Sequence, residues 1–231
     1  MITETIFKLH SELPATVKLV AVSKFHSFEA IEEAYHAGQR IFAESRPQEL
    51  LAKVKQLESF RADRGESDYM SDIEWHFIGH LQTNKLKMVL PYVSLVQSVD
   101  SRRLLDAINV WGASNQRITN VLLEPHVAAE ESKQGFAPEE IYEILKKAGN
   151  GEYTNVRFCG IMGMATYTDD EAVIRSDFAS IRHIYDSAHS VYPEEFFSEL
   201  SVGMSDDYPI AIEYGSTMVR IGSMIFGIRQ Y

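Results

Sequence analysis

The sequence predicts an α/β fold in the form of a single TIM-type (β/α)8 barrel. Strand-like and helix-like segments alternate along the chain, and eight segments of the strand type can be counted. The first of these, residues 17–25, is a short apolar run of the kind that forms parallel strands buried on both faces. The length of 231 residues suits one barrel, although two domains or an open doubly wound sheet would use the same alternation.

The first half of the chain is predicted to hold an N-terminal helix and then four strand and helix pairs. Apolar residues at helical spacing before Pro14 predict the N-terminal helix. Strands are expected at residues 17–25, 40–45, 73–79 and 92–99. Helices are expected from Ser27 to Gly38, at residues 47–60 and 83–90, and from Ser101. The polar stretch 61–72 predicts a surface loop, because the alternation resumes after it.

The second half repeats the pattern. Strands are expected at residues 118–123, 158–164, 196–203 and 218–226, and helices at residues 138–148, 170–190 and 206–214. An irregular acidic segment is expected at residues 124–135. Active sites of such barrels lie at the C-terminal ends of the strands, so residues that end a strand are the first candidates for chemistry.

Composition limits the classes of partner. A formal net charge of −11 argues against a broad nucleic-acid surface, which needs clustered Lys and Arg. The single cysteine, Cys159, excludes an intramolecular disulfide, fits a reducing compartment and is predicted to pack in the core. No apolar stretch approaches the ~20 residues that span a bilayer, and the N-terminus lacks the pattern of a signal peptide. We therefore expect a cytoplasmic protein that binds neither membrane nor nucleic acid.

Lys24 is the leading candidate for a functional residue. It lies at the C-terminal end of the first predicted strand, the edge where α/β folds gather their ligands. An amine held there against apolar walls is suited to Schiff-base chemistry. The alternative is a lysine that ends the strand and points into water, as most lysines do.

Two turns near the C-terminus form a second candidate site. Gly203 and Ser205 follow the seventh predicted strand, and Gly222 and Ser223 lie in the eighth. In barrels, the loops after these strands often bind phosphate through backbone N–H groups. The alternative is that the glycines permit tight turns and the serines cap helices.

An arginine and several histidines stand out among apolar neighbours. Arg220 lies inside a predicted strand and needs an acceptor, either the carboxylate of Glu44 or a ring nitrogen or anion of a ligand. His76, His80 and His126 do not follow a metal-ligand spacing, so no metal site is expected.

Four large apolar side chains of two predicted strands belong to the predicted core. Trp75, Phe77, Met162 and Met164 occur at strand spacing, and we expect them in the barrel interior; the alternative is that they line a cofactor site.

Several motifs, in order along nearly the whole chain, resemble those of the YggS/PROSC family of pyridoxal 5′-phosphate (PLP) homeostasis proteins. They are Ala21-Val22-Ser23-Lys24, Gln48-Glu49-Leu50-Leu51, residues 75–85, residues 130–135, residues 160–166 and residues 200–227. The resemblance implies one barrel over residues 1–231, like the N-terminal domain of alanine racemase.

The resemblance also implies site residues. PLP would form an internal aldimine with Lys24, and Arg220 would contact its pyridine nitrogen. The phosphate loops would include Met204, Ser205, Gly222 and Ser223. Ser45 stands where the family has an asparagine beside the cofactor ring, and His126 stands near the place of another family asparagine. These two departures bear on how tightly the cofactor is held.

The expected function is that of a monomeric PLP carrier or buffer that hands the cofactor to PLP-dependent apoenzymes, and not that of an enzyme. An arginine at the pyridine nitrogen weakens the ring as an electron sink. The first alternative is a small PLP-dependent amino-acid racemase, which would need a second acid or base from a separate β-domain. A barrel enzyme that uses Lys24 on a phosphosugar without PLP is the second.

Overall fold

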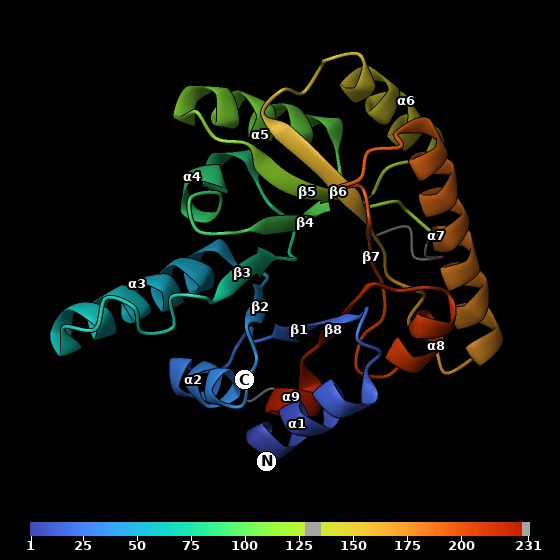
Figure 1. The fold of residues 1–231 in the computed structure, drawn as a ribbon. Helices are drawn as coiled ribbons and strands as arrows, with labels where there is room; N and C mark the ends of the chain where they lie inside the picture. The colour runs from blue at the N-terminus through green and yellow to red at the C-terminus, as the bar shows by residue number, and fades with distance from the viewer. Residues whose placement is uncertain (128–134, 228–231) are drawn as a thin grey trace.

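Eight parallel strands close into a barrel, as predicted. The computed structural model describes residues 1–127 and 135–227. The strands are β1 (Lys18–Val22), β2 (Ile41–Glu44), β3 (Glu74–Phe77), β4 (Leu95–Val99), β5 (Thr119–Leu123), β6 (Val156–Met162), β7 (Glu199–Ser201) and β8 (Met218–Ile221). Each strand pairs with its neighbour in sequence, and β8 pairs with β1 to close the ring (Figure 1).

Helices form an outer layer around this ring (Figure 1). They are α1 (Ile2–Glu12), α2 (Phe28–His36), α3 (Pro47–Arg64), α4 (Leu86–Val89), α5 (Arg102–Asn115), α6 (Pro138–Gly149), α7 (Glu171–Val191), α8 (Tyr208–Glu213) and α9 (Ser223–Phe226), with a 3-10 turn η1 (Thr83–Lys85) before α4. Most of the predicted helices are confirmed within a few residues. The motif predicted at residues 130–135 lies almost entirely outside the described residues, as does much of the predicted irregular segment 124–135.

Several element boundaries differ from the prediction, and those of β8, β7 and α3 are among them. The eighth strand ends at Ile221, because the amides of Ile225 and Phe226 turn back to the carbonyl of Gly222 and start α9. The seventh strand is only three residues long. The helix predicted over 47–60 continues to Arg64 and ends where Gly65 adopts a left-handed φ of 66°.

One small cluster of apolar side chains lies in the barrel interior. It consists of Val20, Val22, Ala43, Leu95, Leu122, Met162 and Met218. Met164 and Cys159 pack against this cluster, so Met162, Met164 and Cys159 lie where the sequence predicted. Burial raises the pKa of the Cys159 thiol to about 11, which keeps it protonated near neutral pH.

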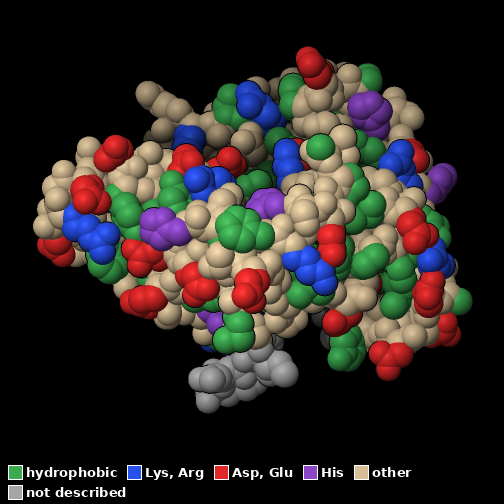
Figure 2. All heavy atoms as spheres, turned by 60° about the horizontal axis from the view of Figure 1, so that its bottom comes forward, with side chains coloured by type: hydrophobic (Ala, Val, Ile, Leu, Met, Phe, Trp, Pro, Cys, Tyr) green, Lys and Arg blue, Asp and Glu red, His purple; other side chains and the backbone are tan. Residues whose placement is uncertain are grey.

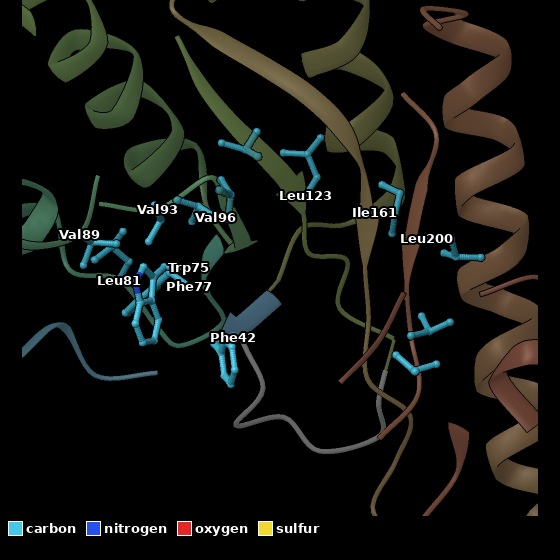
Figure 3. Packing of buried hydrophobic residues seen from close by; sticks show 14 of the residues in the cluster. Phe42, Trp75, Phe77, Leu81, Val89, Val93, Val96, Leu123, Ile161 and Leu200 are labelled. Carbon is cyan, nitrogen blue, oxygen red and sulfur yellow. The ribbon is translucent and has the colours of Figure 1, made fainter. Parts of the chain in front are cut away.

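Trp75 and Phe77 were predicted inside the barrel, and this is wrong. Both belong to the larger apolar layer between strands and helices, where Trp75 packs on Phe42 with ring centroids 6.0 Å apart (Figure 3). The reason is the two-residue period of a strand, which gives the interior position to His76 between them. Inside the barrel, His76 contacts Gln97.

The described surface carries charges of both signs (Figure 2). Acidic and basic side chains are interspersed on the face drawn in Figure 2, without a broad basic patch. Among the described residues, no helix is both long enough and apolar enough to cross a membrane.

Candidate functional site

A cavity of about 250 Å³ opens at the C-terminal end of the barrel. Its lining comes from the ends of β1, β3, β6 and β8 and from the loop after β7. The lining residues are Val22, Lys24, His26, Ile78, Met162, Met164, Met204, Ser205, Asp206, Arg220, Gly222, Ser223 and Gly227. The cavity therefore collects residues that are far apart in the sequence.

All but one of the predicted site residues line this cavity. They are Lys24, Met204, Ser205, Arg220, Gly222 and Ser223. Ser45 is not among the lining residues; it lies past the end of β2, where its carbonyl oxygen packs against Gly79. A β-carbon on Gly79 would fall 2.1 Å from that oxygen. His126 is exposed and is also absent from the lining.

Lys24 owes its position to an unusual backbone conformation of the next residue. Phe25 has a φ of 69°, a region that bulky residues rarely adopt. Its amide donates to Oε1 of Glu49, and the guanidinium of Arg46 lies 4.4 Å from the centroid of its ring. These contacts offset the cost of the conformation and turn the chain away directly after Lys24.

A buried ion-pair network holds the same turn from behind. Lys53 of α3 donates to Oε1 of Glu44 at 2.7 Å, to Oε1 of Glu49 at 3.0 Å and to the carbonyl of Ser23 at 2.8 Å. The Ser23 hydroxyl donates to the same Glu44 oxygen at 2.6 Å. Burial raises the pKa of Glu44, while Lys53 and Ser23 oppose that shift. The network fixes both neighbours of Lys24.

Arg220 does not pair with Glu44, contrary to one of the two partners that the sequence suggested. Its side chain points into the barrel, while Glu44 points outward to α3. Arg220 donates to the carbonyl and hydroxyl of Ser201 at 2.7 and 2.8 Å and to the carbonyl of Gly163 at 2.9 Å. Burial lowers the pKa of Arg220 to about 10, so it stays charged at neutral pH.

The two C-terminal loops meet at the cavity wall beside the end of β1, where Gly222 packs against Val22. Gly203 has a φ of 97°, and its carbonyl accepts from the amide of Arg220 at 3.0 Å. The amide of Met204 donates to Oδ1 of buried Asp207 at 2.5 Å, which bends the loop and presents Ser205 to the cavity. Burial raises the pKa of Asp207.

Sequence reasoning did not assign seven of the lining residues to the site. They are Val22, His26, Ile78, Met162, Met164, Asp206 and Gly227. Val22 and Ile78 carried a signal, since apolar residues at strand ends face the same cavity as Lys24. His26 is held by stacking on Phe226 at 5.1 Å, a long-range contact that no local pattern indicates.

The lining brings several kinds of chemistry together in one place. Lys24 supplies an amine, Arg220 a permanent cation, and Ser205 and Ser223 two hydroxyls beside a glycine. Val22, Ile78 and the two methionines supply apolar walls. This donor set fits a flat ring that carries an aldehyde at one side and a phosphate at another. Within the described ranges, no three His, Cys, Asp or Glu side chains are grouped to hold a metal ion.

Comparisons with known proteins agree with this donor set. Residues 2–230 match the alanine racemase N-terminal domain family. The chain is 37% identical to the pyridoxal phosphate homeostasis protein of Haemophilus influenzae over 228 residues, covering 99% of this chain and 92% of that protein. It is 34% identical over 216 residues to the protein of the same name from Schizosaccharomyces pombe, covering 92% and 84% of the two chains.

Solved structures place the fold in the same group. The PLP-bound structure of PipY from Synechococcus elongatus superposes with a TM-score of 0.85 at 32% identity, covering 98% of this chain and 100% of that one. Alanine racemase from E. faecalis gives a TM-score of 0.67 at 18% identity, covering 98% of this chain and 57% of the racemase chain. That second likeness concerns the fold alone.

Proposed function

The chain belongs to the pyridoxal phosphate homeostasis proteins of the alanine racemase N-terminal domain family, and from this premise we propose that it binds PLP reversibly through Lys24 and acts as a PLP carrier or buffer. The observation that carries the proposal is the convergence of an amine, a cation, two hydroxyls and apolar walls on one cavity. The PLP-bound structure of a relative with 32% identity supports it.

Each lining group has a proposed role. Bound PLP supplies an aldehyde that condenses with an amine and a ring that can take up electrons. Lys24 provides the amine, and its two neighbours keep it at the rim. Arg220 faces the ring nitrogen as a donor, and Ser205 and Ser223 donate to the phosphate. Ser45 does not line the cavity and has no proposed role in PLP binding.

We propose holding and transfer of the cofactor, and no turnover of amino acids. Two relatives that are 37% identical to this chain carry the name of a homeostasis protein, which is not an enzyme name. Arg220 keeps its own proton at neutral pH and leaves the ring nitrogen without one, which suits holding better than carbanion chemistry. The recipients would be PLP-dependent apoenzymes.

Two assays test this function. Protein loaded with PLP should reactivate a PLP-dependent apoenzyme, and it should not racemise amino acids as followed by chiral chromatography. Racemisation on the order of 1–10³ per second would instead establish the racemase alternative. If the loaded protein neither reactivates an apoenzyme nor racemises amino acids, a PLP reservoir or sensor would be the better description.

Removal of the cavity hydroxyls should weaken PLP binding. Ser205→Ala and Ser223→Ala should each cost about 1.5–3 kcal/mol of binding free energy, because each removes a hydrogen bond to an anion. The double variant should lose more than either single one. Equilibrium dialysis measures the affinity, and Ser190→Ala on the exposed face of α7 serves as a control that should bind normally. Unchanged affinity in all three cavity variants would reject this phosphate site.

The proposal also covers the domain organisation and the cellular location of the protein. We propose that residues 1–231 form one PLP-binding domain, because the family match spans residues 2–230. A cytoplasmic location fits the single cysteine and the acidic charge balance.

A further inference from the structure

A file of buried polar side chains crosses the barrel interior beneath the cavity. It starts at Arg220, whose Nη1 donates to the Ser201 hydroxyl at 2.8 Å. That hydroxyl donates to Oε1 of Gln97 at 2.7 Å. The amide nitrogen of Gln97 lies 2.8 Å from Nδ1 of His76 and 3.2 Å from the sulfur of Met218. The file therefore joins β8, β7, β4 and β3 across the ring.

The hydrogen bonds of the file all run in one direction. Arg220 can only donate, so the Ser201 oxygen must accept from it and use its own proton on Gln97. The amide group of Gln97 then faces His76 as a donor, which leaves Nδ1 of His76 as the acceptor and puts the ring proton on Nε2. None of these side chains can exchange its donor and acceptor roles without breaking the hydrogen bond to the next side chain.

The far end of the file is fixed in its neutral form. His76 is 4% exposed, and burial lowers its pKa to about 3. It lines a second cavity of about 240 Å³ at the N-terminal ends of the strands, together with Lys18 and Glu199. Because His76 stays neutral near pH 7, it remains an acceptor for Gln97 across the working range.

Burial makes this arrangement rigid. Gln97 and Ser201 are fully buried, and Arg220 is 4% exposed. Buried polar groups without partners are costly, so each member holds the next in place. Arg220 is also held by the carbonyls of Ser201 and Gly163. The guanidinium therefore enters the cavity wall in one fixed orientation.

We propose that Ser201 and Gln97 are positioning residues for Arg220 and that they set how tightly the protein holds the ring nitrogen of PLP. The proposal rests on the proposed function, because Arg220 must face that nitrogen. Neither residue lines the cavity, so their effect on PLP must pass through the guanidinium. Substitution of Ser201 or Gln97 should therefore weaken the binding only of ligands that carry the ring nitrogen.

The test compares two ligands and five variants, one of which is a control. Ser201→Ala, Gln97→Met and their double variant each break the file, and Ser201→Thr keeps the hydroxyl. PLP is compared with an analogue that carries C–H in place of the ring nitrogen and keeps the aldehyde and phosphate. Ser216→Ala is the matched control, since this buried hydroxyl just before β8 donates to the carbonyl of Val202 just after β7 at 2.8 Å and has no place in the file.

The expected result is specific to the ring nitrogen. Ser201→Ala and Gln97→Met should each bind PLP about tenfold more weakly than the wild type. Both should bind the analogue as the wild type does. The double variant should lose less than the product of the single losses, because both act on the same guanidinium. Ser201→Thr and Ser216→Ala should bind both ligands normally.

Three results would overturn the inference. Equal losses for PLP and the analogue would mean general damage, and unchanged PLP affinity would mean that the file does not act on Arg220. Wild-type protein that fails to bind PLP would overturn the proposed function together with this inference, and this is seen before any variant is made. Urea unfolding checks each variant, and if Ser201→Ala does not fold, Gln97→Met carries the same comparison.

Discussion

Lys24→Ala and Lys24→Arg proteins treated with PLP and borohydride should carry no pyridoxyl group in the cavity, whereas wild-type protein should carry one on Lys24. Borohydride makes a reversible bond between an amine and the PLP aldehyde permanent. Alanine removes the amine, and arginine keeps a positive charge but stays protonated and cannot condense. Peptide mapping by mass spectrometry identifies the modified residue. The two variants together separate loss of the amine from loss of charge.

A matched control makes the result specific. Lys87 lies exposed on α4, away from the cavity, so Lys87→Ala should keep the full adduct on Lys24. A modified peptide without Lys24 in the wild type would contradict the assignment. So would wild-type protein saturated with PLP that yields no adduct at all.

The barrel could be predicted because its signals are local. Each strand is a short apolar run, and each helix has an apolar face between a start signal and a stop signal. The predicted ends of the strands and helices were less accurate, because they depend on which backbone amides and carbonyls form hydrogen bonds with each other. The end of β8 is an example, because the turn of the chain at Gly222 and not the apolar pattern ends the strand.

The site residues that could be predicted are those that lie directly after a strand, because the fold brings these positions together. Lys24, Ser205 and Ser223 lie on loops that a barrel must bring together. Ser45 lies on such a loop too, but the close contact with Gly79 gives it a different surrounding. That contact depends on the pairing of β2 with β3, which the local sequence does not contain.

Buried polar partners were the least predictable feature. Glu44 seemed a reasonable acceptor for Arg220 because both are charged residues in apolar strands. The strand period places them on opposite faces of the sheet, so Glu44 pairs with Lys53 of α3 and Arg220 with Ser201. A lysine on a helix of mixed charge gives no sign in the sequence that it will be buried.

Lys53→Met should destabilise the protein by about 3–5 kcal/mol, because it leaves a buried carboxylate without its cation. Glu44 is fully buried, and its Oε2 already has no hydrogen-bond partner in the described part of the chain. Methionine has a similar length, so little packing volume is lost. Urea unfolding measures the change in free energy. Lys55→Met, on the exposed face of the same helix, should change it little.

The loss should depend on pH in a direction that identifies Glu44. Burial raises the pKa of folded Glu44, and removal of Lys53 removes the cation that opposes this rise. A carboxyl whose pKa is higher in the folded state than in the unfolded state loses stability as pH rises through the folded pKa. The difference between Lys53→Met and the wild type should therefore be larger at pH 8 than at pH 5. A difference that is equal at both values would contradict this cause.

A second substitution completes the test. Replacement of Glu44 as well, in Lys53→Met with Glu44→Gln, should recover much of the lost stability, because no buried charge is left unpaired. The same double variant should still bind PLP less well than the wild type, since the carbonyl of Ser23 loses its bond from Lys53 and Glu49, which accepts from the amide of Phe25, loses its cation. Recovery of stability together with full PLP affinity would mean that the network supports the fold alone, and that the turn holds Lys24 without it.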